Sequence, residues 1–358
     1  MKRILLWAIL AAVLAAGAAI YFARDTIALA LFRSASQGAV ANDIVASLPD
    51  GLTAGFCGTG SPLPDRQRAG PCTAVVAGGR LFIFDVGEGA TETLALMGLQ
   101  PAHIEAVFLT HFHSDHVDGL GGLAVQRWAT AASTAPIPLY GGEGVERLAA
   151  GLREAYALDS TYRVAHHGAA VVPPGGEGYT AHPFAIPEGQ ESAVVFDDAG
   201  VRITAFVVDH GPVRPAFGYR VDYKNRSIVI SGDASPSPSL VRASRNADLL
   251  IHEALSPELV GIMEDNLTAR GMTGVAQIFH DIPDYHTAPA AAAEVADEAS
   301  VGALALTHLI PPLPVSIMEG PFLGEARKRY GGPLWVMRDG DLIILPASGG
   351  IERRHTLR

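Results

Sequence analysis

The sequence predicts a layered α/β domain preceded by an apolar N-terminal segment. From residue 51 onward, short runs rich in β-branched residues alternate with Ala- and Leu-rich helical stretches, a pattern typical of layered α/β folds. The chain of 358 residues is 49% hydrophobic, which is enough for a sizeable core. Only 7% of its residues are aromatic, so that core must be built mainly from Val, Leu, Ile and Ala.

The individual elements follow from local hydrophobic patterns and from the turn residues that bound them. Strands are predicted at 73–77, 81–85, 106–110, 201–208, 227–231, 249–252, 303–307 and 334–337. Helices are predicted at 91–97, 144–155, 289–299 and 320–330.

The N-terminus differs from the rest of the chain. An unbroken apolar run at residues 4–23 follows Lys2 and Arg3 and is long enough to cross a bilayer as a helix. An uncleaved membrane anchor is favoured over a signal peptide cleaved near residues 16–18, because the apolar run is long for a signal. The flanking charges favour export of the C-terminal part, to the periplasm or the cell exterior. We therefore predict an anchor or signal with its linker at 1–35 and a catalytic domain at 36–358.

The net charge limits the classes of partner that the sequence allows, and the cysteine content leaves two bonding states open. The formal net charge is −11, and −14 without residues 1–24, so a nucleic-acid partner is not expected. A homodimer is left open. Cys57 and Cys72 do not have the spacing of a zinc finger. One disulfide between neighbouring strands and two buried thiols are both compatible with the sequence.

Residues of the types that bind metals in proteins follow four separate predicted strands. One strand runs into the segment His111-Phe112-His113-Ser114-Asp115-His116, and the others end at His210, Asp233 and His308. Because ligand crevices of open α/β sheets lie outside the carboxyl ends of strands, these endings are expected to converge on one site.

The convergent residues predict a two-metal centre. Imidazole and carboxylate ligands suit two Zn²⁺ ions, with Mn²⁺ or Fe as alternatives. Two adjacent cations can ionise a bound water and polarise the centre that it attacks. This chemistry serves hydrolysis of phosphate esters, sulfate esters, lactones and amides alike.

These residues resemble the metallo-β-lactamase superfamily, and more narrowly its ribonuclease Z-like branch. The matching segments are 58–62, 84–89, 217–220, 231–234, 247–254 and 285–287. The resemblance implies a four-layer αββα sandwich. It assigns His111, His113 and His210 to one metal, Asp115, His116 and His308 to the other, Asp233 to both, and Asp85 to hydrogen-bonding the histidine loop.

The same resemblance implies a catalytic pair. His286 faces the leaving group as general acid or transition-state stabiliser, and Glu253 orients it; Asp115 is also assigned to catalysis. Residues 258–285 form either a lid over the metals or an ordinary surface segment.

One departure bears on the substrate. Transfer-RNA-processing members carry a long arm between the residues that match His210 and Asp233, whereas here residues 211–232 suffice only for two strands and a turn. A secreted arylsulfatase-like subgroup shares this short connection. We therefore expect a membrane-tethered hydrolase of small anionic esters, either aryl sulfates or phosphodiesters. The alternatives are a ribonuclease Z-type 3′-tRNA-processing endoribonuclease, a lactonase or β-lactamase, and a catalytically idle scaffold.

Overall fold

The computed structural model describes residues 2–40 and 43–357, which divide into two compact units, Met1–Asp43 and Ile44–Arg358. The first unit contains the helix α1 (Lys2–Val40), whose large apolar side chains are exposed on all sides. The stretch Lys2–Gly38 is long and apolar enough to cross a membrane. The run at 4–23 would span about 30 Å of hydrocarbon. This composition fits an anchor or a signal, and export stays a prediction.

The second unit is built on two β-sheets. Among the described residues, eight strands form one sheet in the order β15 (Glu352–His355), β14 (Asp341–Pro346), β1 (Gly51–Gly58), β2 (Cys72–Ala77), β3 (Arg80–Phe84), β4 (Ile104–Phe108), β5 (Ile137–Gly141) and β6 (Tyr179–Pro183). Seven form the other, in the order β13 (Leu334–Val336), β12 (Leu304–Ile310), β11 (Leu249–Leu255), β10 (Arg226–Ile230), β9 (Phe217–Tyr223), β8 (Val201–Val207) and β7 (Ser192–Asp198).

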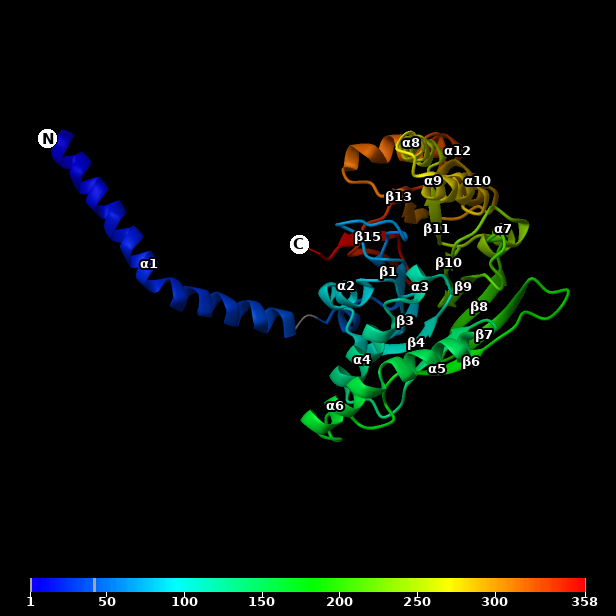
Figure 1. The fold of residues 1–358 in the computed structure, drawn as a ribbon, viewed down its shortest axis with the longest axis horizontal. Coiled ribbons are helices and arrows are strands. Elements are labelled where there is room, and N and C mark those ends of the chain that lie inside the picture. The colour runs from blue at the N-terminus through cyan, green and yellow to red at the C-terminus, as the bar shows by residue number, and fades with distance from the viewer. Residues whose placement is uncertain (1, 41–42, 358) are drawn as a thin grey trace. The chain divides into compact units, whose positions relative to one another are not determined.

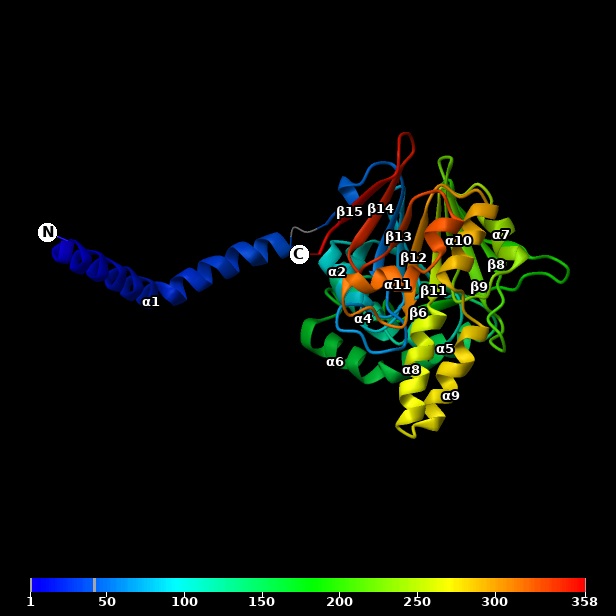
Figure 2. The same cartoon turned by 90° about the horizontal axis from the view of Figure 1, so that it is seen from above.

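Helices cover the outer face of each sheet (Figures 1 and 2). Those that follow strands of the first sheet are α2 (Ala90–Met97), α3 (Ser114–Val117), α4 (Leu120–Ala131), α5 (Val145–Ala155) and α6 (Ala157–His167). Those that follow strands of the second are α7 (Pro238–Ser244), α8 (Pro257–Ala269), α9 (Thr273–Asp281), α10 (Pro289–Glu298), α11 (Glu319–Leu323) and α12 (Ala326–Arg329).

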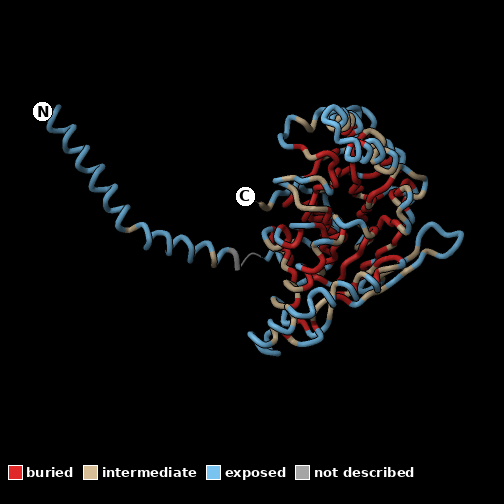
Figure 3. Tube along the Cα trace, viewed as in Figure 1, coloured by how far each residue is buried: buried red, intermediate tan, exposed pale blue. Residues whose placement is uncertain are grey.

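Three buried clusters account for this layering. One lies between the sheets and includes Phe84, Phe108 and Tyr219. The second joins the first sheet to α2 and α4, and the third joins the second sheet to α7 and α10. Alternate side chains of each strand therefore enter different clusters, and the buried residues in Figure 3 fill the interior of the unit. The result is the four-layer αββα sandwich.

Two of the differences between the structure and the sequence prediction concern elements that were predicted in the C-terminal third of the chain. The helix predicted at 320–330 is split into α11 and α12, because Gly324 adopts φ = 51°, outside the helical region. The strand predicted at 303–307 continues to Ile310. By contrast, residues 211–232 contain β9, β10 and a tight turn, so the prediction of two strands and a turn is confirmed.

The two cysteines form a disulfide. The β1–β2 register pairs Gly58 with Cys72 across an irregularity, which leaves the Cα atoms of Cys57 and Cys72 5.0 Å apart. The bond closes the segment 58–71, both of whose anchors are buried.

Candidate metal centre

The structure brings the seven predicted metal-binding residues together at one edge of the two sheets. His111 and His113 follow β4, Asp115 and His116 belong to the short helix α3, His210 follows β8 and Asp233 follows β10. His308 comes from within β12. In each of two groups, every residue offers one potential ligand atom, and these atoms lie within 4.8 Å of one another; the groups are His111, His113, His210 and Asp233, and Asp115, His116 and His308.

Asp233 lies between the two groups. Its Oδ2 is 3.9 Å from Nε2 of both His111 and His210, on one side. On the other side it is 3.3 Å from Nε2 of His116 and 3.4 Å from Nε2 of His308. A single carboxylate oxygen is therefore shared by imidazoles of both groups.

Asp115 completes the second group. Its Oδ2 is 3.5 Å from His116 Nε2 and 3.4 Å from His308 Nε2. Because α3 begins immediately after His113, Asp115 lies in its first turn, beside His116 of the same short helix.

His308 reaches the site through a β-bulge. In the β11–β12 register Glu253 pairs with Thr307 and Ala254 pairs with Leu309, so His308 is the extra residue. It has φ = 46°, which is uncommon for a residue with a side chain. Bulges re-aim a side chain while the strand continues. The expectation that the strand ends at His308 was wrong for this reason.

Buried hydrogen bonds hold the histidine loop, residues 111–116, in place. Asp85 accepts hydrogen bonds from Thr110 N (2.8 Å) and from Thr110 Oγ1 (2.7 Å), and its Oδ2 lies 2.9 Å from His116 Nδ1. Thr110 Oγ1 is 3.0 Å from His111 Nδ1. The Nε2 atoms of both imidazoles are thereby directed toward the site. Thr110 was missed from the sequence, since a threonine at a strand end carries no distinguishing signal.

His210 is oriented by a backbone carbonyl. Its Nδ1 lies 3.1 Å from the carbonyl oxygen of Tyr285, whose ring packs edge-on against the imidazole at 5.3 Å between centroids. Residue type does not specify a contact made by a main-chain oxygen, so this role of Tyr285 could not be predicted from the sequence.

Glu253 and His286 form a pair beside the cluster. Glu253 Oε1 accepts from Thr287 N at 2.9 Å and lies 3.1 Å from His286 Nδ1. Burial lowers the pKa of His286, but the charge and hydrogen bond of Glu253 outweigh burial and raise that pKa to about 9. This shift favours the imidazolium form of His286. His286 also lies within ligand distance of Asp233 and His308.

The donor set fits cations. Within the described part of the chain, Nε2 of His111, His116 and His308 and Oδ2 of Asp115 are buried and have no hydrogen-bond partner. Burial lowers the pKa of His111, His113 and His210, which leaves their lone pairs available near pH 7. Buried polar atoms without partners are costly, and a metal that binds them removes that cost. The His/Asp cluster is thus capable of binding metal.

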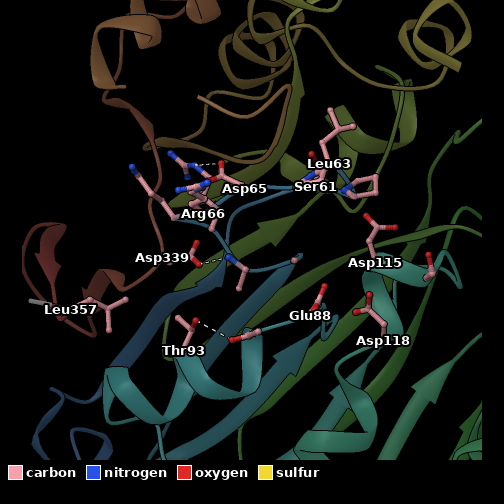
Figure 4. Close-up of a pocket in the computed structure, with 18 residues that line it drawn as sticks. Ser61, Leu63, Asp65, Arg66, Glu88, Thr93, Asp115, Asp118, Asp339 and Leu357 are labelled. Carbon is pink, nitrogen blue, oxygen red and sulfur yellow. Dashed lines mark hydrogen bonds and ion pairs between the residues drawn. The ribbon is translucent and has the colours of Figure 1, made fainter. Parts of the chain in front are cut away.

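A pocket of about 780 Å³ opens beside Asp115 (Figure 4). The segment 61–70 forms one wall, and Glu88 and Asp118 belong to the opposite wall. Arg68 in the first wall donates hydrogen bonds to Thr59 Oγ1 and to the carbonyl of Met337, so its guanidinium stabilises the loop. The pocket gives solvent and substrate a route to the cluster, and its carboxylates disfavour highly charged anions there.

Comparison with known proteins agrees with this geometry. The family model described as "metallo-beta-lactamase superfamily" matches residues 65–299. The chain belongs to the metallo-β-lactamase superfamily. Ribonuclease Z of Mycobacterium marinum is 34% identical over 284 residues, covering 79% of this chain and 94% of that protein. Ribonuclease Z of Mycobacterium bovis is 36% identical over 260 residues, covering 72% and 85%.

Solved structures of the superfamily have the same fold. The short form of human tRNase Z superposes with a TM-score of 0.58 and 25% identity, covering 82% of this chain and 99% of that one. The metallo-β-lactamase fold protein YhfI of Bacillus subtilis gives 0.55 at 20% identity, covering 81% and 98%, and supports the fold alone. With these relatives and the His/Asp cluster, the protein is a metal-dependent hydrolase of the metallo-β-lactamase superfamily that has ribonuclease Z-like homologues.

Proposed function

We propose that this protein hydrolyses phosphodiester bonds of RNA, which is the activity that the name of its ribonuclease Z relatives implies. The observation that carries the proposal is the contact of His286 Nδ1 with Glu253 Oε1, 3.1 Å apart, at the edge of the His/Asp cluster. The expectation that nucleic acid is not a partner is weakened by relatives that are themselves named as ribonucleases.

The chain's own residues divide the work. His111, His113 and His210 would hold one metal, and Asp115, His116 and His308 would hold the other, with the Asp233 carboxylate within reach of both groups. When bound, the cations, Zn²⁺ in our proposal, would lower the pKa of a water molecule, whose proton leaves to solvent, and would polarise the phosphorus centre. When water oxygen forms the new bond to phosphorus, His286 gives its proton to the leaving oxygen as the old bond breaks. Glu253 keeps His286 charged and correctly turned, and Asp85 orients the ring of His116.

A second candidate is an exported hydrolase of small aryl phosphodiesters or aryl sulfates. The Cys57–Cys72 disulfide supports it, because disulfides persist mainly in oxidising compartments. The apolar helix α1 supports it as well, as an anchor or signal that leaves the catalytic unit outside the cytoplasm. The short connection between His210 and Asp233 and the carboxylates around Asp115 also favour a small substrate over a large polyanion.

A substrate panel tests both candidates on the full-length protein in detergent. The panel contains a precursor tRNA with a 3′ trailer, bis(4-nitrophenyl) phosphate, 4-nitrophenyl sulfate, a lactone and a β-lactam, each with and without chelator. We expect chelator-sensitive cleavage of the RNA and of the phosphodiester. Cleavage of the aryl esters without cleavage of RNA would select the second candidate, and turnover of none of them would refute both.

Asp233→Ala provides the matching variant. It deletes the carboxylate shared by both groups, so bound metal and activity should be lost together. Asp159→Ala removes a partly exposed carboxylate that pairs with Arg163 on α6 and serves as the control. Retention of metal by Asp233→Ala would contradict the bridging role.

A further inference from the structure

Tyr285 is an aromatic residue at the edge of the His/Asp cluster, and the proposed mechanism uses it only through its main chain. Its carbonyl oxygen orients His210, and the next residue in the chain is His286. Between ring centroids, the phenol ring lies 5.3 Å from the imidazole of His210 and 5.1 Å from that of His286. The side chain is therefore adjacent both to a residue of the cluster and to the proposed acid.

The phenol ring is held in place by close packing. A Cβ atom at Gly211 would lie 3.1 Å from Tyr285 Cβ, 3.6 Å from its Cγ and 3.7 Å from its Cδ1. Because Gly211 has no side chain, the base of the phenol ring can pack over its backbone, directly after His210. The residue before Tyr285 is also tied down, since the Asp284 carbonyl accepts a hydrogen bond from Ser235 Oγ at 3.3 Å. A ring held in this way loses little conformational entropy when a ligand binds.

The ring nevertheless keeps free surface. Tyr285 is partly exposed, and among the described residues the aromatic rings that contact it are those of His210 and His286. The planes of these imidazoles are inclined to the phenol ring by 80° and 45°, so neither is stacked flat on it. The phenol ring can therefore accept a stacking partner.

The surroundings favour an uncharged, planar partner. Burial raises the pKa of the Tyr285 phenol, and the charges of Asp281 and Asp233 raise it further, so the ring is neutral near pH 7. The same carboxylates disfavour a second anionic group of the substrate at this place. A neutral aromatic ring binds another flat ring by offset stacking, and this contact tolerates different ring types.

The position of the phenol ring identifies the part of the substrate that reaches it. In the proposed mechanism His286 gives its proton to the leaving oxygen, so the leaving group lies beside the His286 imidazole. Stacked rings have centroids about 4.5–7 Å apart, and the rings of His286 and Tyr285 are themselves 5.1 Å apart. A ring carried by the leaving group is thus within reach of Tyr285.

We infer that Tyr285 is a specificity-determining residue whose ring stacks on the planar ring of the leaving group, which in RNA is the nucleobase next to the scissile bond. The inference rests on the proposed function and deepens it, because it names the group that is recognised on the leaving side. An aryl leaving group presents the same chemistry, so a small aryl phosphodiester reports on this contact.

The test compares two substitutions of Tyr285 in the full-length, metal-loaded protein. Tyr285→Leu removes the planar ring but keeps Cβ, Cγ and Cδ1, the atoms that pack over Gly211. Tyr285→Phe keeps the ring. Tyr162→Leu removes an exposed tyrosine on α6 and is the control. Calorimetry gives the Kd of phenylphosphonate and of methylphosphonate, which differ in carrying a ring or a methyl group. Turnover of bis(4-nitrophenyl) phosphate gives KM.

We expect Tyr285→Leu to bind phenylphosphonate about tenfold more weakly than the control and to raise KM for the diester by a similar factor, because it loses one stacked ring. Its affinity for methylphosphonate and its metal content should match those of the control. Tyr285→Phe should bind phenylphosphonate within about threefold of wild type, because the stacking face is kept.

Unchanged binding of phenylphosphonate by Tyr285→Leu would overturn the inference. Equal weakening of both phosphonates, loss of metal, or the same deficit in Tyr285→Phe would also overturn it, because each would show that the side chain only supports the site. Failure of the wild-type protein to turn over any phosphodiester would instead refute the proposed function.

Discussion

The pairing of Glu253 with His286 permits a quantitative test of the proposed acid. Glu253 is buried, and its Oε1 is shared among His286 Nδ1, Thr287 N and Ala234 N. Glu253→Gln keeps an acceptor oxygen of the same shape but removes the charge. Burial, which lowers the pKa of His286, should then dominate and bring that pKa from about 9 to near or below its ordinary value of 6.5.

The magnitude follows from these two values. At pH 8 a group with a pKa of about 9 is about 90% protonated, whereas one with a pKa near 6.5 is about 3% protonated. If His286 donates the proton, kcat at pH 8 should fall about 30-fold, and at pH 6 it should change little. The raised pKa also means that the charged pair stabilises the fold below pH 6.5 and that this contribution, on the order of 3 kcal/mol, disappears as pH rises through about 9.

The assay is the pH dependence of kcat for two phosphodiesters that differ in leaving group, 4-nitrophenol against phenol. In the variant the alkaline limb should move from near 9 to below 7, with the larger loss for the phenyl ester, while metal content stays unchanged. Glu258→Gln changes an exposed carboxylate in the first turn of α8 and is the control. An unmoved alkaline limb, or equal losses for the two esters, would refute the assignment of His286 as the acid.

Three further predictions concern the supports of the site and the fold. Asp85→Asn should lower metal content and activity about 10- to 100-fold, because the amide no longer favours the His116 tautomer that directs Nε2 inward; atomic absorption on dialysed protein measures this. Replacing Cys57 and Cys72 by Ser should lower the free energy of unfolding by about 3 kcal/mol, since the bond closes a loop of 15 residues; urea titration of oxidised and variant protein checks it. Deleting residues 1–43 should move the protein from the membrane fraction to the soluble fraction with kcat/KM unchanged, as measured by fractionation and turnover.

Sequence reasoning predicted which residues form the His/Asp cluster because their residue types and their positions after strands are both visible in the chain. His111, His210 and Asp233 each follow a run of apolar residues, and the structure ends a strand shortly before each of them. His308 was selected from its residue type, but the assumption that its strand ends there was wrong. Its bulge exists because β11 pairs with β12 in a shifted register, a relation between segments about 50 residues apart.

What the sequence left undetermined depends on contacts between distant segments. The bond between Cys57 and Cys72 follows from the β1–β2 register, which brings their Cα atoms to 5.0 Å. The roles of Thr110 and of the Tyr285 carbonyl follow from where the imidazoles point after folding.

The two candidate functions require different cellular compartments, because precursor tRNA is made in the reducing cytoplasm whereas an exported hydrolase works in an oxidising environment. The disulfide that depends on this environment lies next to the candidate metal centre. The disulfide closes the segment 58–71, part of which walls the pocket beside Asp115, and Cys72 lines a small cavity together with His116 and Asp233. In an oxidising compartment this bond holds the pocket wall to the sheet that carries the histidine loop. In a reducing cytoplasm, where tRNA precursors are made, the same wall would depend on Asp339, which accepts hydrogen bonds from Thr59 N and Ala69 N. The oxidation state of Cys57 and Cys72 in cells therefore discriminates between the candidates on the same residues that shape access to the metals: a disulfide in vivo favours the small-ester hydrolase, and free thiols favour the ribonuclease.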